Sequence, residues 1–228
     1  MSIKVGVVLS GCGKMDGAEI HESVLTLLAL DMAGAVAVCL APDMEQKHVV
    51  NHITGKEVSG EKRNVLIESA RIARGDIKNI KDVHARDLDA VIFPGGFGAA
   101  KNISTFAFDG AKCSVCPEAK RLIDEMLAEK KPIGAICIAP VIIAKALFGH
   151  QPPVTLTIGT DQGTAKQIEE MKGKHIVKQV NEIHVDEANR IVTTPAYMLG
   201  PGIKDVWQGI EKLVKQVVAM VKEPVMKR

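Results

Sequence analysis

Short apolar runs alternate along the chain with longer segments whose apolar residues recur at helical spacing. The runs predict buried β-strands at 3–9, 35–43, 88–93, 133–137 and 154–159, and the segment 182–195 predicts a hairpin that turns at Ala188–Asn189. Some strands end in glycine-rich turns, as in "SGCGKMDG" after the first and "PGGFG" after the third. Strands that alternate with helices in this way indicate a parallel sheet covered on both faces.

Helices are predicted between these strands. The first carries apolar residues on one face and ends at Gly34; these residues are Ile20, Val24, Leu27 and Leu28. Further helices are predicted at 116–132, directly after Cys137, at 161–173 and at 203–221. The stretch 43–89 is less regular and predicts a small hairpin at 48–58 and a helix at 64–74.

No linker, repeat or low-complexity tract interrupts the chain, so residues 1–228 are expected to form one three-layer α/β/α domain. In such sheets, ligands bind beyond the carboxyl ends of the strands. Three segments fall at that edge, namely "SGCGKMDGAEIHE", "PGGFG" and "AICIAP". They are far apart in sequence, and we expect them to converge in space.

The composition excludes several classes of partner. The net charge is +2 and aromatic residues are only 3% of the chain, so neither a polyanion nor stacked nucleic-acid bases are expected as ligands. No secretory signal and no apolar run long enough for a bilayer is found, which predicts a cytoplasmic protein that does not bind membranes. Five cysteines at scattered spacings are typical of reduced thiols.

Cys137 stands at a junction between a strand and a helix. Small residues two positions before and after it, Ala135 and Ala139, are what a nucleophile elbow needs to relieve crowding. A thiol at the start of a helix is expected to have a pKa below that of a free thiol. The alternative is a buried, inert cysteine, the common fate of a free thiol.

The glycines of "PGGFG" leave the backbone bare at Gly95 and Gly96. The N–H of Gly96 and the N–H of Ile138 are the natural pair to bind a developing oxyanion. A tight turn that binds no ligand is the alternative explanation of these glycines.

Glu19 and Glu22 lie three apart near the start of the first helix and so share a face. Either could act as the general acid or base beside the thiol. Asp16 followed by Glu19 resembles a capping pair, which gives Glu19 a structural explanation. Glu22 has no such explanation and is the stronger catalytic candidate.

Two other motifs are open to a different interpretation. "GCGKMDG" follows a strand and opens a helix, as a pyrophosphate-binding loop does, but its glycines are spaced G-x-G-x-x-x-G. Cys113 and Cys116 form a lone CxxC, and no further cysteine or histidine nearby completes a zinc site. We therefore expect no metal and no nucleotide cofactor. Cys12 could approach Cys137 at the sheet edge.

Together, "SGCGKMDGAEIHE", "NHITGKE", "RNVLIESARIARG", "DAVIFPGGFGAAKN", "CIAP", "LTIGTD" and "TTPAYM" resemble glyoxalases in the PfpI-like branch of the class I glutamine amidotransferase-like superfamily. The resemblance covers essentially the whole chain. It implies a flavodoxin-like three-layer sandwich with a mostly parallel sheet, a homodimer, an elbow nucleophile at Cys137 and a partner glutamate from the first helix. In the deglycases of this superfamily, the partner glutamate lies at a fixed spacing before the glycine that ends the first helix. The same spacing counted back from Gly34 selects Glu22.

The chain departs from its relatives at the third catalytic group. Glutamine amidotransferases use a late histidine, where this chain has "TTPAYM". PfpI-type proteases have a histidine directly after the cysteine, where this chain has Ile138. The deglycases use a histidine in the loop after the next strand, and Thr160 or Asp161 stands there in this chain.

The resemblance and the residues together predict a cofactor-independent lyase. A glutathione-independent glyoxalase of type III would convert glyoxal or methylglyoxal into a 2-hydroxy acid through a hemithioacetal on Cys137. Two alternatives stay open: a non-catalytic or redox-sensing regulatory protein, and an amidotransferase- or amidase-like subunit linked to isoprenoid biosynthesis.

Overall fold

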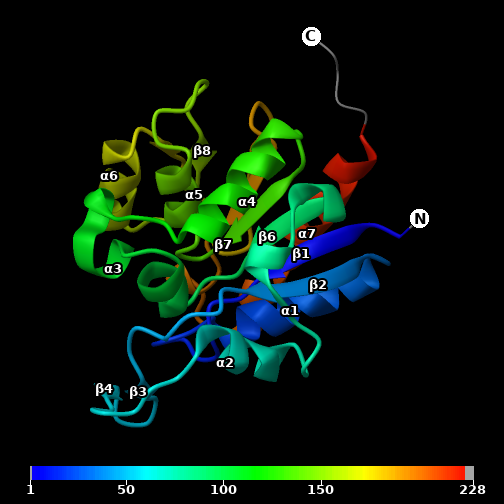
Figure 1. Cartoon of the computed structure of the whole chain (residues 1–228). Coiled ribbons are helices and arrows are strands. Elements are labelled where there is room, and N and C mark those ends of the chain that lie inside the picture. Colours follow the sequence, from blue (N-terminus) through cyan, green and yellow to red (C-terminus); the bar gives the residue numbers. More distant parts are fainter. Residues whose placement is uncertain (1, 224–228) are drawn as a thin grey trace.

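A sheet of seven strands forms the middle layer of the protein (Figure 1). The computed structural model describes residues 2–223. The strands of this sheet are β1 (Lys4–Val8), β2 (Val36–Ala41), β5 (Lys78–Asn79), β6 (Ala90–Phe93), β7 (Ile133–Ile136), β10 (His184–Asp186) and β11 (Ile191–Thr194).

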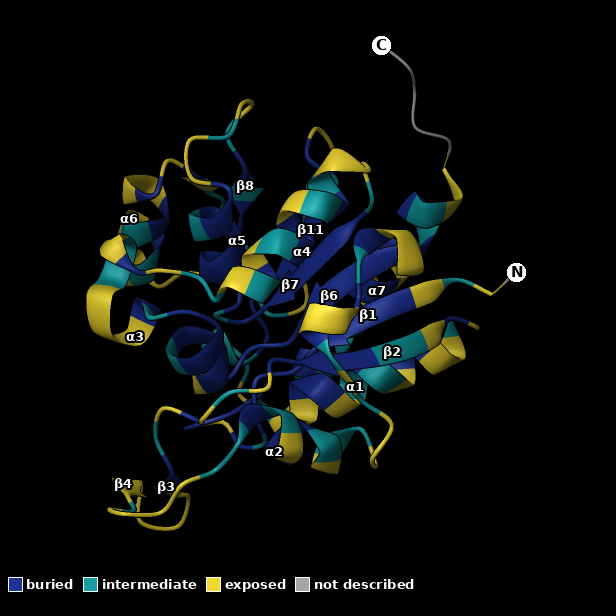
Figure 2. Cartoon of the chain, viewed as in Figure 1, coloured by how far each residue is buried: buried dark blue, intermediate teal, exposed yellow. Residues whose placement is uncertain are grey.

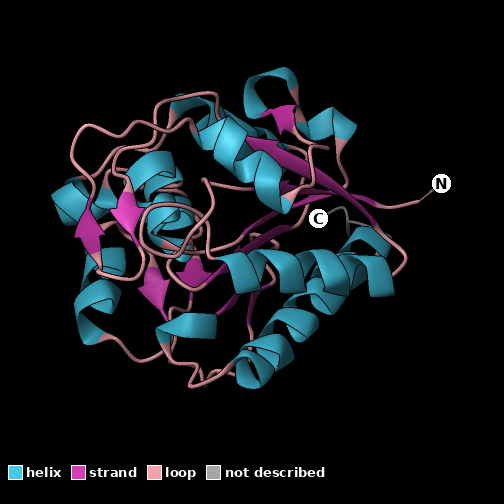
Figure 3. Ribbon diagram, turned by 90° about the horizontal axis from the view of Figure 1, so that it is seen from below, coloured by secondary structure: helices cyan, strands magenta, loops and turns pink. Residues whose placement is uncertain are grey.

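The strand order is β10-β11-β7-β6-β1-β2-β5, and only the pair β10–β11 is antiparallel. The five strands β2-β1-β6-β7-β11 therefore follow the order 2-1-3-4-5 of a flavodoxin-like sheet. The expected three-layer α/β/α fold with a mostly parallel sheet is confirmed. Figure 3 shows helices on both sides of the strands.

The helices begin where the sequence offers a cap. Glu19, Asn64 and Asp161 accept a hydrogen bond from the first turn of α1, α2 and α6, and Pro117 and Pro140 open α4 and α5. The bounds are α1 (Ile20–Met32), α2 (Val65–Ile72), α3 (Phe106–Asp109), α4 (Pro117–Ala128), α5 (Pro140–Ala146), α6 (Gln162–Glu170) and α7 (Ile203–Lys222). Shorter helical turns are η1 (Ile80–Asp82), η2 (Ala85–Asp87), η3 (Ala99–Ile103), η4 (Gly110–Lys112) and η5 (Ala196–Met198).

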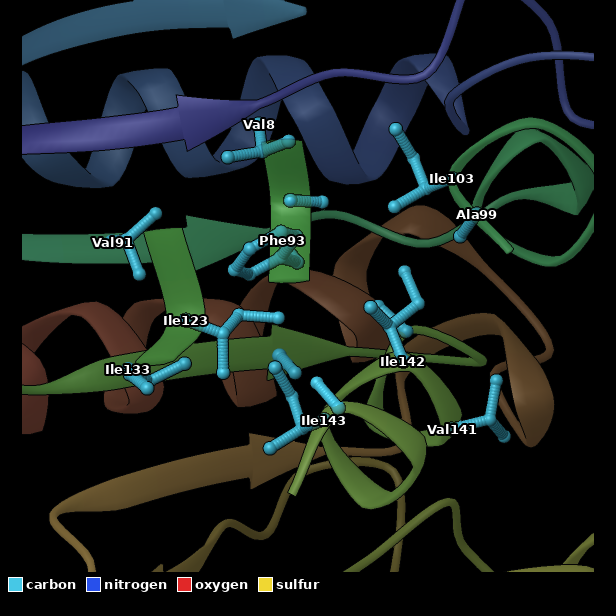
Figure 4. Packing of buried hydrophobic residues seen from close by; sticks show 14 of the residues in the cluster. Val8, Val91, Phe93, Ala99, Ile103, Ile123, Ile133, Val141, Ile142 and Ile143 are labelled. Atoms are coloured by element: carbon cyan, nitrogen blue, oxygen red, sulfur yellow. The ribbon is translucent and has the colours of Figure 1, made fainter. Parts of the chain in front are cut away.

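The core has two halves, one on each face of the sheet. Side chains alternate along β6: Val91 and Phe93 join the cluster that contains α4 and α5, whereas Ile92 joins the cluster on the side of α1 and α7. Figure 4 shows the first cluster around Phe93 and Ile133, and Figure 2 shows the central strands β6 and β7 in dark blue because they are fully buried. Each fully buried side chain of this size stabilises the fold by roughly 1.5–3 kcal/mol.

Two pairs of short strands lie outside the main sheet. β3 (Val50–Asn51) and β4 (Lys56–Glu57) form the small hairpin expected at 48–58. The predicted strand at 154–159 forms only β8 (Thr155–Leu156), which pairs with β9 (Lys174–His175) and not with the main sheet. The carboxylate of Asp186 accepts the Thr155 N–H at 2.7 Å, so a side chain satisfies a group that a neighbouring strand would otherwise bind.

Of the apolar face expected for helix α1, Leu27 packs against the core, but the other three residues point away from it. Ile20, Val24 and Leu28 are 42%, 48% and 45% exposed. The buried residues of α1 are Glu22, Ser23, Thr26, Ala29 and Leu30. The hydroxyls of Ser23 and Thr26 donate hydrogen bonds to carbonyls one turn back in the helix. These bonds offset the free-energy cost of removing the two hydroxyls from water.

Candidate active site

Cys137 follows β7 at a sharp turn and has a left-handed backbone conformation with φ of +61°. Its N–H donates to the carbonyl of Thr194 on β11 at 2.9 Å, which fixes the turn against the neighbouring strand. Ala135 and Ala139 are fully buried beside it, so larger side chains would not fit. The strained residue between two small ones is the geometry of a nucleophile elbow. α5 begins only at Pro140.

Glu22 is fully buried and its carboxylate faces Cys137. Oε2 accepts the N–H of Gly95 at 2.9 Å, and Oε1 accepts the N–H of Tyr197 at 3.2 Å. The thiol of Cys137 interacts with the same carboxylate, and this interaction lowers the pKa of Glu22 and raises the pKa of the thiol. Groups from α1, the loop after β6, the elbow after β7 and η5 therefore meet at one point.

Gly95 is the residue that lets the acid and the thiol approach each other. A Cβ at this position would lie 2.6 Å from Cβ of Cys137 and 2.7 Å from Oε2 of Glu22. The next residue, Gly96, has φ of +92°, and a Cβ there would lie 2.4 Å from the nitrogen of Glu19. The N–H groups of Gly96 and Ile138 both act on the Cys137 thiol and lower its pKa.

The acid and the thiol both hold their protons tightly. Burial raises the pKa of Glu22 to about 8, the charge of Glu19 adds to the rise, and the hydrogen bonds to the carboxylate oppose it. Burial also raises the pKa of the Cys137 thiol well above its ordinary value, and Glu22 adds to this, while the N–H groups of Gly96 and Ile138 lower it by less. The expectation of a lowered thiol pKa is therefore wrong, because desolvation outweighs the local dipoles.

Glu19 caps α1. Its Oε2 accepts the N–H of Glu22 at 2.8 Å, and its own N–H donates to the carbonyl of Gly95 at 3.0 Å. Asp16 does not belong to this cap, because its Oδ2 accepts the N–H of Val50 at 2.7 Å. Glu19 thus has a structural task, and it acts on the site through its charge beside Glu22.

Comparison with known proteins fits this geometry. The model of the DJ-1/PfpI family matches residues 15–196, which include Glu22, Gly95 and Cys137. The chain belongs to the DJ-1/PfpI family. It is 47% identical over 226 residues to the rat "ES1 protein homolog, mitochondrial", covering 95% of this chain and 84% of the relative. It is also 47% identical over 226 residues to the human "Glutamine amidotransferase-like class 1 domain-containing protein 3, mitochondrial", covering 95% and 83%.

A solved structure with the same fold comes from Ehrlichia chaffeensis and is called an isoprenoid biosynthesis protein with amidotransferase-like domain. It is 38% identical in sequence, with a TM-score of 0.87, and the match covers 95% of this chain and 99% of that one.

The cytoplasmic location expected from the composition is wrong. Both mammalian relatives carry the word mitochondrial in their names, which contradicts this expectation. Among residues 2–223, no helix is both long and apolar enough to cross a membrane.

Thr160 and Asp161 do not supply the third group of this DJ-1/PfpI site by hydrogen bonding. Both are exposed, and Asp161 caps α6 by accepting the N–H of Thr164 at 2.7 Å. Within residues 2–223, neither forms a hydrogen bond to Cys137 or Glu22. The loop packs instead against the segment after β11, since a Cβ on Gly159 would lie 2.7 Å from Leu199.

Sequence reasoning missed Tyr197. It stands in "TTPAYM", the slot of the late histidine in amidotransferases, and reaches Glu22 through its backbone N–H. The preceding Ala196 has φ of +43°, a strained value that aims this N–H. Tyr197 is the only tyrosine in the chain, which was the one signal available.

Backbone hydrogen bonds close the glycine-rich loop after β1 on itself. In "GCGKMDG" the N–H groups of Gly13 and Gly17 bind carbonyls of the same turn, so neither is free for a phosphate. The charged groups around Cys12 are Glu68, Arg71, Asp16 and Arg63.

The CxxC cysteines, Cys113 and Cys116, are not joined in a disulfide. Burial raises the pKa of Cys113, and it raises that of Cys116 to about 11. Among the described residues 2–223, no group of three His, Cys, Asp or Glu side chains is arranged to hold a metal ion.

Proposed function

We propose that this protein is a glutathione-independent glyoxalase that converts glyoxal or methylglyoxal into a 2-hydroxy acid. One observation carries the proposal: the buried carboxylate of Glu22 lies against the elbow thiol of Cys137 across Gly95, and the N–H groups of Gly96 and Ile138 act on the same sulfur. The arrangement combines a nucleophile, a base and an oxyanion site, as addition to an aldehyde requires.

The reaction begins when Glu22 takes the thiol proton of Cys137 and the sulfur adds to the aldehyde carbon. The carbonyl oxygen becomes an alkoxide, which the N–H groups of Gly96 and Ile138 stabilise, and protonation gives a hemithioacetal. Glu22 then moves a proton from the former aldehyde carbon to its neighbour through an enediol, which leaves a thioester. Water hydrolyses the thioester to the 2-hydroxy acid and frees the thiol. Substrate and water account for every atom, and no electron acceptor is required.

The protonation state of Glu22 supports this role. A base works best when its pKa lies near the working pH, and the pKa of Glu22 is raised to about 8. The raised thiol pKa of Cys137 means that the thiol depends on a neighbouring base rather than on prior ionisation. The sequence resemblance to glyoxalases of the PfpI-like branch and membership in the DJ-1/PfpI family support the same activity.

Turnover of glyoxal and methylglyoxal without glutathione or added metal tests the proposal. The wild type is expected to form glycolate and lactate, and Cys137→Ser is expected to form neither while it keeps its melting temperature. Serine replaces one sulfur by oxygen, so the variant removes the nucleophile and little volume. Equal activity in both proteins, or none in the wild type, contradicts the proposal.

A redox-sensing role is the second candidate. The donors that stabilise an alkoxide beside Cys137 would also bind the oxygen of an oxidised sulfur. A protein that is inert to aldehydes but oxidised by peroxide at Cys137 before Cys39 would favour this role. The third candidate, an amidase or amidotransferase subunit, lacks the late histidine, and Tyr197 stands in its place.

We also propose that the protein is a homodimer that pairs through α1. Its exposed apolar residues recur every fourth position and form one ridge, made by Ile20, Val24, Leu28 and Met32. Leu28→Lys is expected to halve the mass in light scattering. Ile53→Lys is the control, because Ile53 is 96% exposed on the β3–β4 hairpin. An unchanged mass in Leu28→Lys contradicts this assembly.

A further inference from the structure

Tyr197 is held by two successive residues of α1. Its backbone N–H donates to Oε1 of Glu22 at 3.2 Å. Its hydroxyl oxygen lies 2.7 Å from Nδ1 of His21, and the two rings are 5.8 Å apart at a tilt of 47°. One end of the residue therefore touches the acid of the site, and the other end is anchored to the adjacent turn.

The backbone at this point needs such an anchor. Ala196, with φ of +43°, lies in a left-handed region that is unfavourable for a residue with a Cβ. A strained peptide persists only where the surrounding contacts hold it. The His21–Tyr197 hydrogen bond joins this segment to the helix that carries Glu22, so it opposes relaxation of Ala196.

We propose that His21 and Tyr197 form a positioning pair that holds the Tyr197 N–H on Glu22 and so keeps the other carboxylate oxygen turned to Gly95 and Cys137. The proposal rests on the proposed function, since it assigns the residues that orient the base. It gives the "TTPAYM" slot a task in a chain whose late histidine is absent. Neither residue touches the reacting atoms, so both act through Glu22.

The groups that face Glu22 come from every element around it. Glu19 lies at the start of α1, Cys137 lies after β7, and Tyr197 lies in η5 with His21 bonded to it. Burial raises the pKa of the Tyr197 phenol, and the charges of Glu19 and Glu22 add to the rise. The phenol therefore stays neutral at physiological pH and can hold His21 by hydrogen bonding alone.

Loss of the pair has a defined effect on proton release. A hydrogen bond donated to a carboxylate favours its charged form, and the Tyr197 N–H lowers the pKa of Glu22 in this way. Without the anchor, the strained peptide can turn away and Glu22 loses a donor. Because Glu22 and Cys137 are coupled, the proton that they share should then be released at higher pH.

The test follows the rate at which iodoacetamide alkylates Cys137 as a function of pH, measured on the Cys137 peptide by mass spectrometry. Tyr197→Phe and His21→Leu are each expected to move the profile to higher pH by up to about one unit, as the loss of a hydrogen bond to a charged group allows. His21→Asn, whose amide can take the place of Nδ1, is expected to restore most of the wild-type profile. In the same variants kcat with glyoxal should fall more than KM changes.

A matched control comes from another histidine–hydroxyl pair. Nε2 of His184 lies 2.7 Å from Oγ1 of Thr155, outside the site, so Thr155→Val should leave the alkylation profile unchanged. The double variant of His21→Leu and Tyr197→Phe should shift the profile no further than either single change, because both remove one contact. The proposal is overturned if the alkylation rate of Cys137 depends on pH in the two single variants as it does in the wild type.

Alkylation needs no turnover, so this outcome is separate from the outcome of the glyoxalase assay. If Tyr197→Phe fails to fold, His21→Leu alone decides, since His21 is exposed on α1.

Discussion

Gly95 lies between the carboxylate of Glu22 and the thiol of Cys137, and the two groups can approach each other because this residue has no side chain. Its N–H binds Glu22, and the space where its Cβ would lie is shared by Glu22 and Cys137. The pair is therefore in contact because of the smallest residue in the loop. A base and a nucleophile at such short range can pass a proton without a water molecule between them.

Gly95→Ala should therefore disable the site. The added methyl group meets Cβ of Cys137 at 2.6 Å and must push the elbow away from Glu22. We expect turnover to fall at least about a hundredfold and the free energy of unfolding to fall by about 1–3 kcal/mol, the usual cost of overpacking. Glyoxal turnover and urea unfolding measure the two effects. Unchanged turnover in Gly95→Ala would mean that the contact is not needed.

Glu22 and Glu19 offer a matched comparison on one helix turn. Glu22→Gln removes the base and should lose most turnover while the fold is kept. Glu19→Gln weakens the cap on the Glu22 N–H and should cost about 1 kcal/mol of stability. It should also lower the pKa of Glu22, because the neighbouring charge is gone. If Glu19→Gln proved the inactive variant and Glu22→Gln the active one, the two roles would be reversed.

The pH dependence of turnover follows from the same acid. Glu22 must be ionised to accept the thiol proton, and its pKa is about 8. The rate kcat/KM should therefore rise with pH and level off above pH 8, whereas an unperturbed glutamate would give a plateau from about pH 5. Steady-state rates between pH 5 and pH 10 check this. A flat profile across pH 8 would argue against Glu22 as the base.

At the scale of elements, α1 shows where sequence patterns stop being informative. The positions and types of the main strands and helices could be predicted, because apolar runs, caps and prolines mark them. The buried face of α1 could not, since Glu22, Ser23 and Thr26 are polar and are satisfied by contacts from other segments and from their own helix. Apolar spacing alone could not say which face of α1 the core covers.

Another element-scale contact joins α4 to the turns before β6. Oε1 of Glu125 lies 3.0 Å from Nδ1 of His84, Oε2 accepts the Ala85 N–H at 2.9 Å, and Arg121 binds the same carboxylate at 2.8 Å. Burial raises the pKa of Glu125, but these hydrogen bonds outweigh it and lower the pKa to about 2.

Glu125→Gln should therefore destabilise the protein at neutral pH by about 1 kcal/mol, the scale of a partly exposed charged contact. A carboxyl whose pKa is lowered on folding stabilises the fold above its unfolded pKa. The contribution is lost as pH falls from about 4.5 towards about 2. In urea unfolding, the difference in free energy of unfolding between wild type and Glu125→Gln should be smaller at pH 3 than at pH 7. A gap that is equal at both pH values would contradict the assignment.

At the scale of the whole molecule, the convergence of distant segments was predictable. Parallel strands end at one edge, so the loops after β1, β6 and β7 had to meet there. Tyr197 was not predictable, because it contributes a backbone N–H whose direction depends on the strained Ala196. Thr160 and Asp161 were chosen by analogy with relatives, and the structure gives Asp161 the task of capping α6.

Glu22 also affects the stability of the whole fold. Its pKa is raised from 4.5 to about 8 on folding, so between these values the folded protein holds a proton that the unfolded chain releases. Stability should therefore fall as pH rises from about 4.5 to about 8, and the slope should be missing in Glu22→Gln. Urea midpoints of both proteins across this range measure it. Parallel curves for the two proteins would contradict the raised pKa.

Glu22 and Tyr197 meet although 175 residues separate them along the chain. Ribosomes extend a chain by roughly 5–20 residues per second, so Cys137 is made seconds before the residues that complete its surroundings. During that interval the Tyr197 N–H has not yet been made, and Cys137 is one of five thiols in the nascent chain. The contact between Glu22 and the Tyr197 N–H can therefore form only after the chain has been extended well past Cys137.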